Sequence, residues 1–455
     1  MFDETIAAIA TPIGEGGLAV IRLSGRDALA VADRSFVPTG KNAVKPSAAP
    51  SHTIHYGHIE RHGRIIDEVL LSVLRSPRTF TRQDTIEISC HGGILTAKMV
   101  LDIVLENGAR LAEPGEFTKR AFLNGRLDLA QAEAVADVIH ARTELALFAA
   151  NEQLAGKLSR QIDQLRDDLM AALAHIEAHI DFPDEDIQPD TRERLIARLQ
   201  EGLAQMDRLL HTANEGQILR RGIRAAIVGR PNAGKSSLLN QLLGHDRAIV
   251  SPIPGTTRDT IEETANIRGL PVIFIDTAGL RDARDEIEQE GVRRSRESLD
   301  RADLILHVMD SSEPISPADS ASIRQMAGRK FILVGNKTDL PRKLHLPEGT
   351  PASVAVSCVT GQGLDALKDA IKAAVWSGEI QGEMLQVMIN SRHQDALRRA
   401  KDGLVRAVAG LRGALTLELV ASDLHLAVNA VGEIVGRTST EDLLDSIFSQ
   451  FCIGK

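Results

Sequence analysis

Residues 229–236 read Gly-Arg-Pro-Asn-Ala-Gly-Lys-Ser, which are the residue types and spacing of a phosphate-binding loop. Gly229 and Gly234 permit a tight turn whose successive backbone N–H groups point at phosphate oxygens. Lys235 can reach the β- and γ-phosphates, and the Ser236 hydroxyl can ligate Mg²⁺. An alternating apolar run precedes the loop and a segment of helical spacing follows it. The sequence therefore predicts a strand, the loop, and a helix whose N-terminus faces the phosphates.

Three later motifs predict that the bound nucleotide is GTP. Residues 276–279, Asp-Thr-Ala-Gly, follow an apolar run, and this aspartate should hold Mg²⁺ through water while the glycine N–H meets the γ-phosphate. Residues 336–339, Asn-Lys-Thr-Asp, follow another apolar run. The Asp339 carboxylate can accept both N1–H and the exocyclic amine of guanine, a pair that adenine does not offer. Residues 357–359, Ser-Cys-Val, suit a loop that closes over the base.

Two loops carry the candidate hydrolytic groups. Leu280 stands where Ras-type GTPases carry the glutamine that orients water, so either hydrolysis is vestigial or another group does that work. The charged run 281–290 offers carboxylates, although most charged runs simply face solvent. Thr257 is the natural second protein ligand of Mg²⁺. The Asn232 side chain and backbone carbonyls of loop 251–259 could hold a monovalent cation in place of an arginine finger. The residues predicted to bind GTP are Asn232, Ala233, Gly234, Lys235, Ser236, Ser237, Ser251, Pro252, Ile253, Pro254, Gly255, Thr256, Thr257, Asp276, Thr277, Ala278, Gly279, Asn336, Lys337, Asp339, Ser357, Cys358 and Val359.

The composition is that of an ordinary globular protein of 455 residues, 43% hydrophobic and 25% charged. A net charge of −9 and an aromatic content of 3% exclude a generally basic, base-stacking surface, so any RNA contact would be local or made through a partner. No apolar stretch approaches the roughly 20 residues that span a bilayer, and no signal-peptide core follows the acidic start. The three cysteines show neither metal spacing nor a disulfide framework. These features predict a cytoplasmic protein with no membrane segment.

The order of patterns predicts a multidomain fold with one inserted domain. The GTP motifs lie on alternating strands and helices, as in a Ras-like α/β P-loop domain, whereas the flanks have α+β and then helical patterns. Insertion is tolerated because the ends of a domain are often close together. We expect an N-terminal α+β domain over 1–118, a helical domain in two parts over 119–216 and 379–455, and an inserted G domain over 217–378.

Local patterns predict several elements of the flanking domains. The alternating runs 18–23 and 85–89 predict strands, and the Pro-, Ala- and Ser-rich residues 39–51 predict a loop. Residues 195–210 repeat leucine and methionine at helical spacing. Residues 438–441, Thr-Ser-Thr-Glu, predict a capping box at the start of the last helix.

Five further sequence blocks are distinctive, namely Thr-Pro-Ile-Gly-Glu-Gly-Gly at 11–17, His-Gly-Gly at 91–93, Pro-Gly-Glu-Phe at 114–117, Leu-Asp-Leu-Ala-Gln-Ala-Glu-Ala at 127–134 and Phe-Cys-Ile-Gly-Lys at 451–455. Through these blocks and the GTP motifs, the whole chain resembles the MnmE (TrmE) family of bacterial and mitochondrial tRNA-modification GTPases. The resemblance implies a homodimer that acts on tRNA in a heterotetramer with the FAD-dependent protein MnmG. It implies that this pair adds an aminomethyl or carboxymethylaminomethyl group at C5 of the wobble uridine, with a one-carbon unit from 5-formyl- or methylene-tetrahydrofolate. The N-terminal domain would bind the folate and dimerise.

The resemblance also implies roles in the G domain. In this family K⁺ drives G-domain dimerisation and replaces the arginine finger. The family's water-orienting glutamate aligns with Glu288, which would then be catalytic. The implied K⁺ ligands are Asn232, Ser251, Ile253 and Thr256, and the implied Mg²⁺ ligands are Ser236 and Thr257.

Four residues match the family's folate-binding positions, namely Arg22, Glu87, Arg126 and Lys455. Arg126 stands where relatives can carry lysine, which keeps the charge but changes the contacts that the side chain can make. A carboxylate suits pterin N–H groups, and cations suit a glutamate tail. Without the resemblance, Arg22 and Glu87 could equally be a cross-strand ion pair, and Arg126 a surface charge at a helix start.

The family places Cys452 near the folate and suggests a catalytic role for its thiol. Taken alone, this cysteine would be a tail residue without a role or a small buried hydrophobe. Thiolate chemistry needs an electropositive setting, which Lys455 could supply. Cys90 and Cys358 are predicted to be structural.

Two other functions compete with tRNA modification. A ribosome-assembly GTPase of the Era or Der kind would use the same nucleotide motifs as a switch on rRNA. Such a protein carries a basic RNA-binding module such as a KH domain after the G domain, and none is visible here. A scaffold that binds GTP without hydrolysing it would rest on Leu280 alone.

Overall fold

The structure is a computed structural model, and it divides the chain into two compact units. The first comprises Met1–Ala136 with Asn429–Lys455, and the second comprises Asp137–Val428. Among the described residues, no helix is both long enough and apolar enough to cross a membrane. The structure describes residues 4–41, 43–181, 189–244, 262–275, 299–346, 353–376, 385, 387–413 and 415–455.

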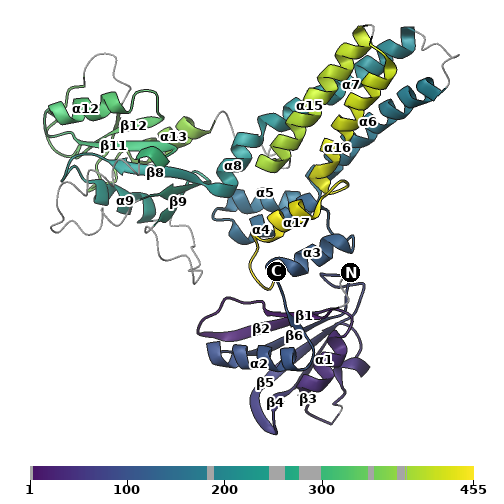
Figure 1. The fold of residues 1–455 in the computed structure, drawn as a ribbon. Helices are drawn as coiled ribbons and strands as arrows, with labels where there is room; N and C mark the ends of the chain where they lie inside the picture. The colour runs from purple at the N-terminus through teal and green to yellow at the C-terminus, as the bar shows by residue number, and fades with distance from the viewer. Residues whose placement is uncertain are drawn as a thin grey trace. The chain divides into compact units, whose positions relative to one another are not determined.

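The described part of the first unit is built on a mixed sheet with strand order β3-β4-β5-β6-β2-β1-β7 (Figure 1). All its pairs are antiparallel except β1 with β7. The α+β prediction for this region is confirmed, including the strands expected at 18–23 and 85–89. The strands are β1 (Ile6–Ile9), β2 (Gly16–Ser24), β3 (Phe36–Pro38), β4 (Thr53–Arg61), β5 (Arg64–Leu74), β6 (Thr85–Gly92) and β7 (Arg110–Leu111), and the helices are α1 (Ala28–Ser35), α2 (Ile94–Glu106), α3 (Glu116–Leu123), α4 (Leu129–His140) and α17 (Glu441–Phe448).

The two faces of this sheet differ. Alternate residues such as Ile21 and Leu71 are fully buried and form one core with residues of α1 and α2. The residues between them point to the opposite face, where Tyr56 lies directly opposite Leu70 and both are about half exposed, at 50% and 47%. Leu18 on β2 lies on the same face of the sheet as Tyr56 and Leu70 and is 67% exposed. The sheet therefore presents an apolar face that α1 and α2 do not cover.

The predicted capping box of the last helix is wrong by two residues. The N-cap of α17 is Thr440, whose hydroxyl accepts a hydrogen bond from the Leu443 N–H. Thr438 instead donates to the Asn429 carbonyl at 2.9 Å. The two threonines in this segment offer the same capping oxygen, and contacts of the preceding turn decide which one is used.

The second unit contains long helices whose buried residues recur at helical spacing. On α6 these include Leu158, Ile162, Leu165 and Leu169. Helix α7 packs against both α6 and α15. The predicted helical domain interrupted by a nucleotide-binding domain is confirmed. The helices are α5 (Glu144–Leu154), α6 (Lys157–Asp181), α7 (Pro189–His211), α8 (Ala213–Arg221), α15 (Ser391–Arg412) and α16 (Leu417–Val435).

Between α8 and α15 lies an α/β domain with sheet order β13-β12-β11-β8-β10-β9 among its described strands (Figure 1). All pairs are parallel except β10 with β9. In such a sheet, ligands bind at the carboxyl ends of the strands. The strands are β8 (Ile223–Val228), β9 (Glu263–Ile267), β10 (Leu270–Phe274), β11 (Leu304–Asp310), β12 (Phe331–Asn336) and β13 (Ser353–Ala355), and the helices are α9 (Lys235–Gly244), α12 (Pro317–Gln325) and α13 (Leu364–Val375).

Candidate functional site

The phosphate loop lies between β8 and α9, as predicted, and both its glycines are required by geometry. Gly229 has φ +144°, and a Cβ there would lie 2.1 Å from the Val308 carbonyl oxygen on β11. Gly234 has φ +94°, and a Cβ there would lie 2.1 Å from Asn336 Nδ2. Neither position accepts a side chain without moving the backbone or the amide beside it.

The Lys235 ammonium is held over this loop. Its Nζ donates to the carbonyls of Gly229 and Arg230 at 2.9 and 2.8 Å. Among the described residues it has no carboxylate partner, and burial lowers its pKa. A half-buried cation whose hydrogen bonds go only to neutral carbonyls suits a phosphate, so the loop fits a nucleotide.

The two motifs predicted to contact the base, residues 336–339 and 357–359, meet the phosphate loop around Asn336. Its Nδ2 donates to the Ala233 carbonyl at 3.0 Å, and its Oδ1 accepts from the Cys358 N–H at 3.2 Å. The Asp339 carboxylate accepts from the Ser357 hydroxyl at 2.6 Å. The phosphate loop, the residue 336–339 motif and the base-closing loop therefore form one connected structure.

Two residues that the sequence interpretation missed support this end of the site. Asp310 receives a 2.6 Å ion pair from Lys337, and Gln241 on α9 donates to the Cys358 carbonyl at 2.8 Å. Asp310 had a sequence signal, because it ends the apolar run of β11 at the same sheet edge as Asn336. Gln241 had none, since a polar helix residue is normally solvent-facing.

Most predicted groups around the γ-phosphate lie outside the described residues. These are Leu280, Glu288, the 251–257 loop and residues 276–279. Of the predicted metal ligands, only Asn232 and Ser236 are described; Asn232 has φ +61° within the loop. In the described residues no group of three or more His, Cys, Asp or Glu side chains could hold a metal ion.

In the first unit, Arg22 and Glu87 form the cross-strand ion pair that was one of the two sequence interpretations. They are register partners on β2 and β6, and Arg22 Nη2 lies 2.8 Å from Glu87 Oε1. Both residues alternate along their strands with buried core residues, so their side chains lie on the sheet face that α1 and α2 leave open. Arg22 also donates to the Gly454 carbonyl at 3.3 Å and lies over the Phe117 ring at 5.8 Å.

The segment 448–455 is built tightly against the same place. Gly454 has φ +98°, and a Cβ there would lie 2.5 Å from the Ile9 carbonyl oxygen. The N–H groups of Gly115 and Phe117 donate to the carbonyls of Cys452 and Lys455 at 3.4 and 3.2 Å. These contacts bring Lys455 near the Arg22–Glu87 pair.

The pKa of Lys455 reflects the charged groups that lie close to it. Burial and then the charge of Arg22 lower the pKa of Lys455, while Glu87 and Cys452 oppose the shift. Three of the four predicted folate residues are therefore gathered at one place. The Cys452 side chain is exposed beside them. Burial instead raises the pKa of the Cys90 and Cys358 thiols to about 11, which suits the predicted structural role.

Arg126 is not joined to the other three by any hydrogen bond or ion pair among the described residues. It is exposed in the turn before α4, donates to the Thr79 carbonyl at 3.0 Å and lies over the Phe80 ring at 4.9 Å. Phe80 packs on a small core that contains Phe117, over which Arg22 lies. Arg126 and Arg22 thus lie over two different aromatic rings of the same small core.

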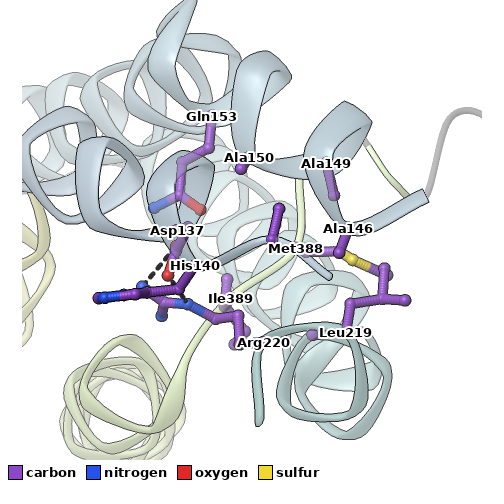
Figure 2. Close-up of a pocket in the computed structure, with 12 residues that line it drawn as sticks. Asp137, His140, Ala146, Ala149, Ala150, Gln153, Leu219, Arg220, Met388 and Ile389 are labelled. Atoms are coloured by element: carbon purple, nitrogen blue, oxygen red, sulfur yellow. Dashed lines mark hydrogen bonds and ion pairs between the residues drawn. The ribbon is translucent and has the colours of Figure 1, made fainter. Parts of the chain in front are cut away.

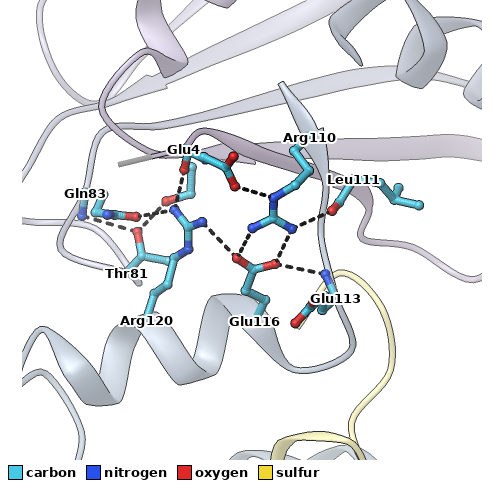
Figure 3. A network of polar contacts seen from close by, with 9 residues as sticks. Glu4, Thr81, Gln83, Arg110, Leu111, Glu113, Glu116 and Arg120 are labelled. Carbon is cyan, nitrogen blue, oxygen red and sulfur yellow. Dashed lines mark hydrogen bonds and ion pairs between the residues drawn. The ribbon is translucent and has the colours of Figure 1, made fainter. Parts of the chain in front are cut away.

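A buried ionic network fixes the start of α3, which carries the residues that hold the 448–455 segment (Figure 3). Glu116, 3% exposed, accepts from Arg110 Nη2 at 2.7 Å, from Arg120 Nη2 at 2.8 Å and from the Glu113 N–H at 2.9 Å. Arg120, 1% exposed, also donates to the Glu4 carbonyl at 2.9 Å. The network ties β7, α3 and the chain entering β1 together.

In the second unit, an ion pair anchors α8, the helix that leads into β8. Arg220 Nε donates to Asp137 Oδ1 at 2.7 Å, at the edge of a small cavity (Figure 2). Gly216 on α8 approaches the Ile389 backbone so closely that a Cβ would lie 2.4 Å from its carbonyl oxygen. The entry into the G domain is thus fixed by contacts with the helical part of the same unit.

Comparison with known proteins covers almost the entire chain. The family model for the GTP-binding protein TrmE N-terminus matches residues 5–126, and the model for the MnmE helical domain matches residues 129–452. The proteins named tRNA modification GTPase MnmE from Geobacillus kaustophilus and Bacillus subtilis are 48% and 46% identical to this chain. The alignments cover 99% of this chain and 99% and 100% of those proteins.

A solved structure, the G domain of the T. maritima FeoB iron transporter, is 27% identical and covers 33% of this chain and 98% of its own, with a TM-score of 0.24. The family assignment depends on the full-length sequence matches instead. The chain belongs to the MnmE (TrmE) family of tRNA modification GTPases and is a GTPase.

Proposed function

We propose that this GTPase modifies tRNA with a flavin-dependent MnmG partner. The product is a C5 aminomethyl or carboxymethylaminomethyl group on the wobble uridine of certain tRNAs. The full-length similarity to proteins of that name supports the tRNA part of the proposal. The single observation that supports the one-carbon part is the gathering of Arg22, Glu87 and Lys455.

The chemistry of that gathering fits a reduced folate. The Glu87 carboxylate, 30% exposed, keeps one oxygen outside the Arg22 pair, and a carboxylate accepts the N–H groups of a pterin well. Lys455 and Arg22 suit the anionic glutamate end. When bound, 5-formyl- or methylene-tetrahydrofolate would supply the one-carbon unit. The Cys452 side chain is exposed beside these residues, where the family resemblance suggests a catalytic role for its thiol.

The open face of the sheet supports a homodimer. Tyr56, Leu70 and Leu18 are 47% to 67% exposed on the face that also carries Arg22 and Glu87. Contiguous exposed apolar residues commonly mark protein–protein interfaces. A second copy on this face would cover these side chains and lie beside the proposed folate residues.

GTP serves as the switch in this proposal. Ser236 and Thr257 would hold Mg²⁺, and Asn232, Ser251, Ile253 and Thr256 would hold the K⁺ on which G-domain dimerisation depends, with Glu288 orienting water. We expect single-turnover hydrolysis to be faster in K⁺ than in Na⁺ at equal ionic strength. Equal slow rates would favour a non-hydrolysing scaffold. Glu288→Ala should slow hydrolysis and leave nucleotide affinity intact, whereas a joint loss of both would make Glu288 structural.

Nucleoside analysis of tRNA from a deletion strain tests the function directly. We expect the modified wobble uridines to disappear, to return with the wild-type gene, and not to return with Glu87→Gln. Glu60→Gln is the matched control, because Glu60 is exposed at the end of β4 away from Glu87. Unchanged wobble uridines in the deletion strain would refute the proposal.

A further inference from the structure

A second basic site lies in the first unit, in a cavity of about 510 Å³. Three arginines, Arg78, Arg82 and Arg126, line it together with Thr79 and Phe80. Only Arg126 belongs to the predicted folate set. A volume of this size is typical of pockets that bind small molecules.

The walls of this cavity are held in place from both sides. Arg82 Nη1 donates to the Asn124 carbonyl at 2.9 Å, and Asn124 Nδ2 donates to the Thr81 carbonyl at 2.7 Å. Arg126 Nη1 donates to the Thr79 carbonyl at 3.0 Å. The loop before β6 and the turn before α4 are thus joined by three hydrogen bonds, so Arg82 and Arg126 are positioned before any ligand arrives.

The charge of the cavity is not balanced within the protein. Among the described residues, none of the three arginines is in an ion pair, whereas Arg22, Arg110 and Arg120 in the same unit all have glutamate partners. Burial and the charge of Arg82 lower the pKa of Arg126. A cluster of unpaired guanidinium groups around one cavity favours an anion, and the planar fork of arginine matches carboxylates and phosphates.

The position of the cavity indicates which kind of anion it binds. The Phe80 ring under Arg126 packs on the core that contains Phe117, and Arg22 lies over the other aromatic ring. The basic cavity and the gathering of Arg22, Glu87 and Lys455 are therefore built on the same small core. Cellular folates carry a chain of γ-linked glutamates, and each added glutamate brings one further carboxylate.

We propose that the cavity binds the polyglutamate tail of the folate donor, with Arg78 and Arg82 binding carboxylates beyond the first glutamate. This inference rests on the proposed folate function. It makes the polyglutamylated folate the preferred form and gives Arg78 and Arg82 no role in binding the monoglutamate.

Equilibrium binding of 5-formyl-tetrahydrofolate as the monoglutamate and as the tri-γ-glutamate to the full-length protein tests the inference. We expect the triglutamate to bind the wild type at least about tenfold more tightly, as charge-assisted hydrogen bonds to two arginines would give. In Arg78→Gln with Arg82→Gln the ratio should fall to about one, with monoglutamate affinity unchanged. Arg78→Gln alone is a second variant that leaves the walls intact, because the three hydrogen bonds that hold them do not involve Arg78. Arg64→Gln, at an exposed hairpin residue, is the charge-matched control and should keep the wild-type ratio.

The outcomes separate this inference from the function on which it rests. Equal affinities for both forms in the wild type would overturn the tail site and leave the folate function standing. Failure of both forms to bind would overturn the folate function itself. If the arginine variants weaken binding of a tRNA anticodon stem-loop and leave the folate ratio unchanged, the cavity serves RNA phosphates and the inference is wrong.

Discussion

The side-chain amide of Asn336 donates to the carbonyl of Ala233 at 3.0 Å and thereby joins the residue 336–339 motif to the phosphate loop. The same amide accepts from the Cys358 N–H. All these groups are buried, at most 8% exposed for the residues concerned, so the amide satisfies polar groups that water does not reach.

Asn336→Ala should therefore weaken both the G domain and its affinity for GTP. Leaving two buried groups unpaired costs about 2 to 4 kcal/mol in the free energy of unfolding. Trp376, the one tryptophan of the chain, is buried in the G-domain core, so its fluorescence reports urea unfolding of that domain. Asn240→Ala on the exposed side of α9 is the matched control. An Asn336→Ala midpoint equal to that of the control would contradict the bridging role.

Gly454→Ala should weaken folate binding without affecting the nucleotide site. Its φ of +98° and the 2.5 Å distance from a Cβ to the Ile9 carbonyl oxygen mean that a methyl group must displace the backbone beside Lys455. We expect at least about a tenfold loss of 5-formyl-tetrahydrofolate affinity, equivalent to about 1.4 kcal/mol. GTP affinity should stay at the wild-type value. Gly14→Ala, where nothing lies within 4 Å of the added carbon, should bind folate normally. Full affinity in Gly454→Ala would show that the segment does not position Lys455.

Glu116→Gln should destabilise the first unit by about 3 kcal/mol, because Arg120 would keep a buried charge with a weakened partner. Although burial opposes its ionisation, hydrogen bonds from Arg110, the Glu113 N–H and Arg120 hold the pKa of Glu116 below its usual range. The stabilisation is therefore complete above the unfolded pKa of about 4.3 and is lost as pH falls through the folded value.

Thermal melting followed by circular dichroism from pH 7 to pH 3 checks this, with Glu113→Gln as the control because its side chain is exposed. The difference in melting temperature between wild type and Glu116→Gln should disappear as the pH falls to 3. A difference in melting temperature that is constant with pH would mean that altered packing, and not the lost charge, causes the destabilisation.

His307 should make the G domain sensitive to mild acid. This residue on β11 is 2% exposed, and neither ring nitrogen has a hydrogen-bond partner among the described residues. Burial lowers its pKa, with a smaller opposing influence from Asp319. The unfolded chain takes up a proton below about pH 6.5 while the folded chain stays neutral, so stability falls as pH decreases through that value, by up to about 1.4 kcal/mol per pH unit.

Urea midpoints from Trp376 fluorescence at pH 7.5 and 5.5 test the effect. His307→Leu should reduce the loss between the two pH values, and the control His211→Leu, at an exposed helix residue, should not. Equal losses in all three proteins would assign the acid sensitivity to other groups.

Local patterns predicted those parts of the fold and site that depend on short-range order. The strand, glycine turn and helix around Lys235 follow from residue spacing, and the pairing of Arg22 with Glu87 follows from alternation on two strands. The Glu116 network was not predictable, because its partners come from separate segments and buried charges are rare. The N-cap of α17 was also predicted at the wrong threonine. Thr438 and Thr440 carry the same capping hydroxyl, and only their contacts in the folded chain distinguish them.

The position of Gly115 against residues 448–455 has a consequence for how the protein is made. The first unit is completed by residues 429–455, so it stays incomplete on the ribosome until all of residues 137–428 have been synthesised. At about 5–20 residues per second that interval lasts about 15 to 60 seconds. During it, the backbone around Gly115 and Phe117 lacks the carbonyls of Cys452 and Lys455, and the rings of Phe448 and Phe451 do not yet exist to pack beside them. The contacts that complete the first unit can therefore form only after the whole of the second unit has been synthesised.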